Sequence, residues 1–253
     1  AGLTDAVQKS LLDLGGGPGT FDMAAAKERG VIVTNTPDSI ADSVADLALG
    51  LMIAVMRRIG ECDRFVRAGR WTAGLPPMGR DLTGKTCGIV GFGAIGKRIA
   101  KRVEVFGMAV SYHGPREKPD VAYPFYADLE SMARAADCLI VTCPLTPATR
   151  NLVDARILDA LGAEGFLVNV ARGAIVDESA LIAALREKRI AGAGVDVFRD
   201  EPRVPAELMA MEQVVLVPHI GSSTLEIREE RGRKLLANLR AHFAGRPVVT
   251  PVT

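Results

Sequence analysis

The chain has 253 residues, of which 48% are hydrophobic and 24% charged, with a formal net charge of +1 at pH 7. This composition is typical of a folded globular protein and excludes a disordered, collagen-like or disulfide-scaffold chain. The balanced charge and the aromatic content of 5% also argue against a nucleic-acid binder or an anionic-membrane binder, so we expect neither partner.

Four cysteines, Cys62, Cys87, Cys138 and Cys143, are scattered without a CxxC pair. Zinc and iron–sulfur sites commonly use such pairs, so we predict no metal site and a reducing compartment. The first fourteen residues carry charged side chains and no long apolar stretch, which is unlike an export signal. A cytoplasmic protein is therefore expected.

Residues 1–37 hold about two strands and one helix, too little to bury a core alone. They either complete a domain with the C-terminal helix or indicate a fragment of a longer chain.

Ser39 and Asp42 are spaced as in a capping box, which predicts a long helix beginning at Ser39. The uncharged part of this helix, residues 47–56, is too short to cross a bilayer. Its nearly uniform apolarity predicts burial between domains or between subunits. Residues 69–79 are predicted to be an irregular connection.

A regular alternation of apolar strands and helices follows Leu82. Strands are predicted at residues 87–90, 109–112, 138–142, 166–170, 193–197 and 214–217, and helices at residues 95–106, 129–136, 152–161, 178–187 and 224–243. Continuous apolar strands separated by helices are typical of a parallel sheet covered on both faces. We predict an α/β fold with a doubly wound parallel sheet over residues 38–222, and a truncated, discontinuous second α/β lobe from residues 1–37 and 223–253.

The segment from Gly91 to Gly96 fits the pattern GxGxxG between a predicted strand and a predicted helix. In that context Gly91 permits a tight turn, Gly93 lets the backbone approach a pyrophosphate, and Gly96 lets the helix pack on the strand. The free N–H groups at the helix start, including those of Ala94 and Ile95, then face the phosphates. The pattern predicts a dinucleotide-binding (Rossmann) domain.

The end of the second strand indicates which dinucleotide binds. An acidic residue there would bind the ribose hydroxyls and repel a 2′-phosphate, but none follows His113 directly. Arg116 is the nearest cation, which favours NADP(H) over NAD(H). The alternative is an exposed loop whose charges, including that of Glu117, contact no cofactor.

Polar residues follow three strands near their carboxyl ends: Arg172, the pair Asp196 and Glu201, and His219. In a doubly wound sheet these ends form the ligand crevice. An arginine can bind a substrate carboxylate through two hydrogen bonds. A histidine can donate or accept a proton near neutral pH, and a neighbouring carboxylate orients it.

These motifs resemble those of the D-isomer-specific 2-hydroxyacid dehydrogenase family over nearly the whole chain. The supporting stretches are residues 34–37, 43–49, 91–96, 143–147, 169–173, 196–198 and 218–222. Within the family the sequence is most similar to hydroxyphenylpyruvate and hydroxypyruvate/glyoxylate reductases that prefer NADPH.

The resemblance implies a role for each matching residue. Arg172 would hold the substrate carboxylate and keto oxygen, His219 would be the general acid for reduction, and Glu201 its partner. The resemblance also implies that the cofactor contacts Asp196, Cys143, Pro144 and Gly221. The backbone N–H groups of Gly16 and Gly17 would bind the substrate carboxylate. The helix after Ser39 would serve in a homodimer. A nucleophilic role for Cys143 is disfavoured because no base is paired with it in the sequence.

Two departures from the family pattern concern the substrate lobe. Family members carry an additional N-terminal stretch, and the glycine-rich segment at residues 15–19 lacks the usual aspartate. We also expect no regulatory domain after Thr253.

The resulting hypothesis is a reductase that transfers hydride from NAD(P)H to a small 2-keto acid, giving the D-2-hydroxy acid. Hydroxypyruvate, glyoxylate and arylpyruvates are the candidate substrates. The alternatives are an NAD-dependent dehydrogenase of the phosphoglycerate type, a nucleotide-sensing binding protein, and an inactive fragment of the same fold.

Overall fold

A computed structural model describes residues 10–12, 22–36 and 40–252. The chain divides into two compact units, one combining residues 1–40 with 222–253 and the other comprising residues 41–221. The larger unit contains the glycine-rich loop and every candidate residue from Gly91 to Gly221.

The larger unit is built on a seven-stranded parallel sheet in the order β5-β4-β3-β6-β7-β8-β9. Its strands are β3 (Thr86–Val90), β4 (Ala109–His113), β5 (Phe125–Tyr126), β6 (Cys138–Val141), β7 (Phe166–Asn169), β8 (Gly192–Val195) and β9 (Val214–Leu216). The chain starts at β3, runs outward through β4 and β5, then returns to β6 and runs outward the other way. This is the predicted doubly wound fold, and the strand order reverses between β3 and β6.

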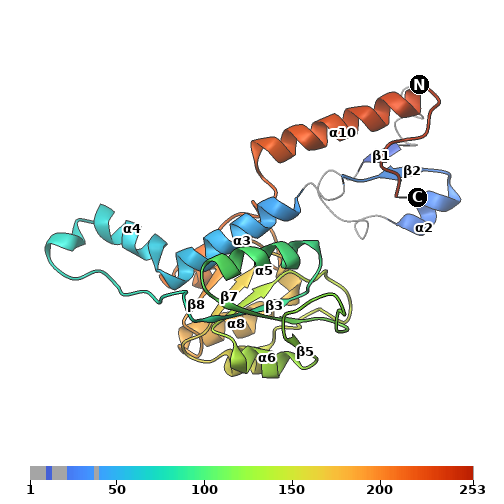
Figure 1. Cartoon of the computed structure of the whole chain (residues 1–253). Helices are drawn as coiled ribbons and strands as arrows, with labels where there is room; N and C mark the ends of the chain where they lie inside the picture. The colour runs from blue at the N-terminus through green and yellow to red at the C-terminus, as the bar shows by residue number, and fades with distance from the viewer. Residues whose placement is uncertain (1–9, 13–21, 37–39, 253) are drawn as a thin grey trace. The chain divides into compact units, whose positions relative to one another are not determined.

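Helices cover both faces of this sheet (Figure 1). On one face α3 (Ala41–Met56) packs against α5 (Ala94–Val105), and on the other lie α6 (Leu129–Ala135), α7 (Ala155–Leu161) and α8 (Glu178–Arg186). The side chains of Asp128, Asp154 and Asp177 cap α6, α7 and α8 by accepting N–H groups of the first turn. The central strands β6, β7 and β8 are buried along their whole length, as expected for continuous apolar runs.

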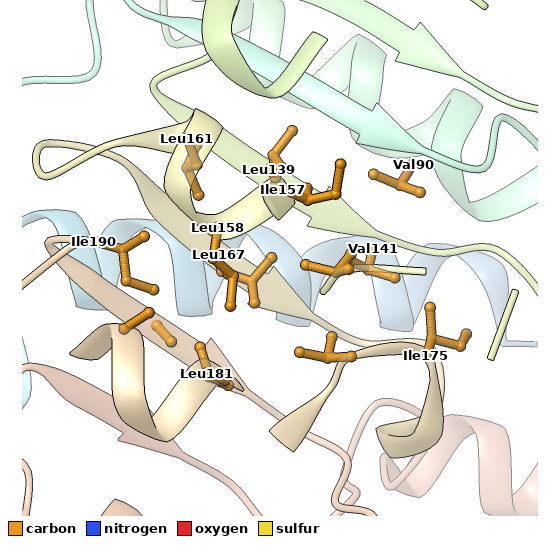
Figure 2. Packing of buried hydrophobic residues seen from close by; sticks show 14 of the residues in the cluster. Val90, Leu139, Val141, Ile157, Leu158, Leu161, Leu167, Ile175, Leu181 and Ile190 are labelled. Carbon is orange, nitrogen blue, oxygen red and sulfur yellow. The ribbon is translucent and has the colours of Figure 1, made fainter. Parts of the chain in front are cut away.

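A continuous apolar core fills the space between the sheet and α6–α8. Figure 2 shows Leu139, Val141 and Leu167 of the sheet among Leu158 of α7 and Leu181 of α8, and all five side chains are buried. Each buried aliphatic side chain of this size contributes about 1.5–3 kcal/mol. This packing fixes the strands, and thereby the loops at their carboxyl ends.

The sequence predicted the start of the long apolar helix but not its end. It stops at Met56, Arg58 adopts a left-handed φ of 54°, and a second helix, α4 (Ile59–Arg67), follows. A 3-10 turn, η2 (Arg70–Thr72), lies in the segment predicted to be irregular. The predicted start at Ser39 lies outside the described residues. Of the helices described, none is both long and apolar enough to cross a membrane.

Other boundaries also move, for local reasons. The helix predicted from residue 152 begins at Ala155, because Asp154 caps it and Val153 pairs with Val176 in an isolated bridge. The short elements that were not predicted include the edge strand β5, the 3-10 turn η3 (Gly173–Ile175) and the single-turn helix α9 (Ala206–Met209).

The smaller unit joins segments from both ends of the chain. The parallel strands β1 (Ser10–Leu12) and β2 (Ile32–Thr34) flank α2 (Met23–Glu28), and α10 (Leu225–Phe243) precedes the C-terminal tail. The N–H of Val252 donates to the carbonyl of Val33, and that of Asn35 donates to Thr250. The buried amide of Asn238 in α10 accepts the N–H groups of residues 249 and 250, which ties helix and tail together.

Candidate active site

The glycine-rich loop between β3 and α5 has the backbone geometry that its three glycines predict. Gly91 has a φ of +94°, and a Cβ there would lie 2.6 Å from the Cα of Cys143. A Cβ on Gly96 would lie 2.4 Å from the carbonyl oxygen of Gly91, so the start of α5 packs directly on the turn. A side chain at either position would force the loop open.

Gly93 differs from the other two glycines because it faces open space. A Cβ built on Gly93 would have no protein atom within 4 Å. The helix begins at Ala94, so the N–H groups of Ala94 and Ile95 belong to the first turn, which has no intrahelical acceptors. An uncrowded glycine beside a helix N-terminus fits the diphosphate of a dinucleotide.

The end of β4 lies directly beside this loop. The N–H of Gly91 donates to the carbonyl of His113, the last residue of β4, at 2.9 Å. Arg116 and Glu117 are both exposed in the segment that follows. A Cβ on Gly114 would have no atom within 4 Å, so this position has room for a side chain.

Cys143 and Pro144 follow β6, on the other side of the point where the strand order reverses. The backbone of Cys143 is in close contact with Gly91, and the hydroxyl of Thr142 donates to the Gly91 carbonyl at 2.5 Å. Burial raises the pKa of the Cys143 thiol to about 11. The thiolate is therefore scarce at neutral pH, which supports a lining role over a nucleophilic one.

His219 and Glu201 form a hydrogen-bonded pair. The Nδ1 atom of His219 lies 2.7 Å from Oε2 of Glu201, and both side chains are partly exposed. The other carboxylate oxygen of Glu201 accepts the N–H of Phe198 at 3.0 Å. Because Nδ1 faces Glu201, the Nε2 atom is the one available to a substrate.

Asp196, at the end of β8, fixes the loop that carries His219. Its two carboxylate oxygens accept the N–H groups of Ile220, at 2.6 Å, and Gly221, at 3.1 Å. Its own carbonyl accepts the N–H of His219 at 2.8 Å. Burial raises the pKa of the Asp196 carboxyl above its usual value, while these backbone hydrogen bonds lower it. The sequence predicted a cofactor contact here and not this loop-supporting role.

Arg172 follows β7 in a loop that is braced by its neighbours. The buried side chain of Asn169 donates to the carbonyl of Arg172 and accepts the N–H of Ala171. The guanidinium of Arg172 is exposed and donates to the carbonyl of Ala171 at 2.7 Å. The arginine is thus presented to solvent from a fixed backbone.

The loops after β7 and β8 interlock. A Cβ on Gly173 would lie 2.0 Å from the carbonyl carbon of Phe198, so the two backbones are in direct contact. In the same peptide, the N–H of Arg199 donates to the carboxylate of Glu178 in α8 at 3.2 Å. Residues that follow Arg172 therefore hold the segment that carries Glu201.

Hydrogen bonds thus join His219 to both Glu201 and Asp196. Gly173, the residue after Arg172, packs against Phe198 in the segment that leads to Glu201. Sequence reasoning missed Asn169 and Glu178, although Asn169 lies in a quoted motif. The predicted contacts of Gly16 and Gly17 lie outside the described residues. Among the residues that are described, no group of three His, Cys, Asp or Glu side chains could hold a metal ion.

Residues 49–221 match the family described as "D-isomer specific 2-hydroxyacid dehydrogenase, NAD binding domain". The chain is 49% identical to glyoxylate/hydroxypyruvate reductase A of Arabidopsis thaliana over 92% of its own length and 74% of the relative's. It is 47% identical to hydroxyphenylpyruvate reductase of Plectranthus scutellarioides, over 91% and 74% of the two chains. The crystal structure of an NADPH-dependent glyoxylate/hydroxypyruvate reductase from Sinorhizobium meliloti, in complex with NADP and malonate, is similar with a TM-score of 0.89 and 39% identity, over 96% of this chain and 77% of that one.

Proposed function

The chain belongs to the D-isomer specific 2-hydroxyacid dehydrogenase family and is an NAD(P)H-dependent reductase of small 2-keto acids, and from this premise we propose how it works. The proposed substrates are hydroxypyruvate, glyoxylate and arylpyruvates, which share a carboxylate next to a ketone. The product is the D-2-hydroxy acid. Reductases of glyoxylate, hydroxypyruvate and hydroxyphenylpyruvate among the relatives support this choice.

The observation that carries the proposal is the Glu201–His219 pair at the carboxyl ends of β8 and β9. With Nδ1 held 2.7 Å from the carboxylate, His219 presents Nε2 as the acid that protonates the keto oxygen. Glu201 stabilises the protonated imidazole by its opposite charge and fixes the ring orientation. The N–H of Phe198 holds Glu201 itself in place.

Arg172 is proposed to bind the substrate. Its exposed guanidinium can grip the carboxylate through two parallel hydrogen bonds, and it also polarises the keto oxygen. When bound, the reduced nicotinamide supplies the hydride that the keto carbon receives. The positively charged Arg172 stabilises the negative charge that develops on oxygen before His219 delivers its proton.

The cofactor is proposed to lie along the carboxyl edge of the sheet. The backbone of Gly91, Gly93 and Gly96, with Ala94 and Ile95, would hold the diphosphate. Cys143, Pro144, Asp196 and Gly221 would line the nicotinamide end. Asp196 can still accept a carboxamide N–H, because each carboxylate oxygen accepts two hydrogen bonds.

NADPH is the proposed preference. Arg116 would bind the 2′-phosphate, and no carboxylate stands at Gly114 to repel it. Hydrogen bonds between charged groups contribute about 1.5–3 kcal/mol, which corresponds to roughly ten- to hundredfold discrimination against NADH.

We propose that the smaller unit is part of the substrate-binding lobe.

The segment of residues 57–80, named here the arm, belongs to the larger unit and exposes Trp71, Leu75 and Met78. The arm borders a cavity of about 490 Å³ in the larger unit. A second copy of the chain is proposed to cover these side chains in a homodimer. All four cysteines are free thiols, which supports a cytoplasmic location.

A substrate panel tests the function. Oxidation of NADPH, followed at the nicotinamide absorbance band, should proceed with hydroxypyruvate, glyoxylate and phenylpyruvate. Hydroxyacetone is the matched control, because it is hydroxypyruvate with a methyl group in place of the carboxylate that Arg172 would bind. Equal rates with hydroxyacetone and hydroxypyruvate would contradict the role of Arg172, and no turnover with any of the acids would contradict the substrate class.

Cofactor choice is tested by affinity. The unmodified protein should bind NADPH more tightly than NADH, and Arg116→Ala should weaken NADPH binding about ten- to hundredfold without affecting NADH. Gly114→Asp, at a position with room for the side chain, should strengthen the relative binding of NADH. Tighter binding of NADH by the unmodified protein would overturn the preference.

A further inference from the structure

The loop that carries Arg116 is closed by one side chain of the strand that precedes it. The backbone N–H of Lys118 donates to the hydroxyl of Tyr112 at 2.8 Å. Tyr112 lies in β4, one residue before its end, and Lys118 lies two residues beyond Arg116. The hydrogen bond therefore folds the segment back onto the strand and encloses Arg116 within a short loop.

The ring that carries the Tyr112 hydroxyl is buried and packs against two other aromatic rings. The side chain is fully buried, with its ring centroid 4.6 Å from that of Phe92 and 5.3 Å from that of Phe125. Phe92 stands between Gly91 and Gly93 in the glycine-rich loop. Tyr112 thus contacts the diphosphate-binding loop through its ring and the Arg116 loop through its hydroxyl.

We propose that Tyr112 is a specificity-determining residue that positions Arg116 for the 2′-phosphate of NADPH. This rests on the proposed role of Arg116. A guanidinium gives its full benefit when it is held in the geometry of the phosphate, and ordering a free loop at the moment of binding lowers affinity. The hydroxyl of Tyr112 orders the loop beforehand. NADH has no 2′-phosphate, so its binding does not depend on this hydrogen bond.

The matched variants are Tyr112→Phe and Tyr123→Phe. Tyr123 belongs to the same aromatic cluster, 5.7 Å from Phe92, but its hydroxyl donates to Glu104 of α5. Loss of one neutral hydrogen bond predicts that Tyr112→Phe raises the KM for NADPH about three- to tenfold. We expect the KM for NADH and the kcat with either cofactor to stay as in the unmodified protein, and the melting temperature to fall by no more than a few degrees, about the effect of one hydrogen bond. Tyr123→Phe should leave the ratio of the KM for NADPH to the KM for NADH unchanged.

A double-variant cycle identifies the route of the effect. If Tyr112 acts through Arg116, then Tyr112→Phe has no further effect on NADPH binding in the Arg116→Ala background. An equal loss for both cofactors in Tyr112→Phe, or an additive loss in the double variant, would overturn the inference. If Tyr112→Phe keeps the preference for NADPH over NADH while Arg116→Ala reduces it, the inference about Tyr112 is wrong, although the proposed cofactor preference stands. Failure of that preference appears separately, as equal losses for both cofactors in Arg116→Ala alone.

Discussion

His219 occupies a backbone conformation that is rare for a residue with a side chain. Its φ of 54° lies in the left-handed region, which costs about 1–3 kcal/mol for a residue other than glycine. Asp196 offsets this cost by accepting three backbone N–H groups, from His219 through its carbonyl and from Ile220 and Gly221 through its carboxylate. The hydroxyl of Ser43 in α3 adds a hydrogen bond to the carbonyl of Gly221. The buried carboxylate of Asp196 thus stabilises the unfavourable backbone conformation of His219, the proposed acid.

Substitution of the pair tests the proton transfer. His219→Ala should lower kcat about 10²- to 10⁴-fold while the dissociation constant for NADPH stays unchanged. Glu201→Gln should also lower kcat, because the imidazole loses the carboxylate that orients it through Nδ1. The control is His242→Ala, which removes a histidine of α10 and should leave both properties intact. An unchanged kcat in Glu201→Gln would remove Glu201 from the mechanism.

The cysteines should differ sharply in reactivity. Burial raises the pKa of Cys87 to about 12 and that of Cys143 to about 11, and raises that of Cys138 well above its usual value. At pH 8 these thiols are almost fully protonated, and Cys62 is the more accessible one. A disulfide reagent should therefore modify one thiol rapidly in the native protein, and none in Cys62→Ser. Rapid modification of two or more thiols in the folded protein would show that the buried three are accessible.

The candidate residues were predictable where a short motif carries the chemistry. The glycines of residues 91–96, Arg172 and His219 stand next to predicted strand ends, and strand topology alone gathers them at one edge. Residues that support them through distant contacts were not predictable. Tyr112 and Glu178 each bond a backbone N–H, and nothing in the local sequence indicates which N–H group that is.

At the level of elements, the contact between the loops after β7 and β8 should be intolerant of any side chain. Gly173→Ala would place a Cβ 2.0 Å from the carbonyl carbon of Phe198, so the segment that carries Glu201 must shift. A displacement of about 1 Å in catalytic groups can cost roughly 10²-fold in rate, and we expect kcat to fall by that order with NADPH binding retained. Gly50→Ala in α3 is the control, because a Cβ there meets nothing within 4 Å. Normal kcat in Gly173→Ala would show that the loops are not coupled.

The elements themselves were largely predictable because the central strands are buried on both faces. Continuous apolar runs at β6, β7 and β8 leave little choice of partner or face. The errors fall where tertiary contacts decide. The break at Arg58 and the short strand β5 have no strong local signal, and β5 exists through its pairing with β4.

At the scale of the whole molecule, the arm predicts association. Leu75 is 93% exposed, and the large apolar side chains of Trp71 and Met78 in the same arm are 66% and 89% exposed. We expect a dimer in sedimentation equilibrium, and we expect Leu75→Lys to shift it toward monomer by introducing a charge into the interface. Val105→Lys is the matched control, since Val105 is 84% exposed on α5 and lies outside the arm. A monomeric unmodified protein, or equal effects of the two variants, would contradict the proposed interface.

The central claim is that this chain delivers hydride and proton to a 2-keto acid to give the D-2-hydroxy acid. Its most direct test is chiral chromatography of the product formed from hydroxypyruvate and NADPH by the purified protein. We expect D-glycerate in a one-to-one ratio with the NADPH oxidised, and loss of this product in His219→Ala. Formation of the L enantiomer, of a racemic mixture, or of the same amount of D-glycerate by His219→Ala at an undiminished rate would contradict it.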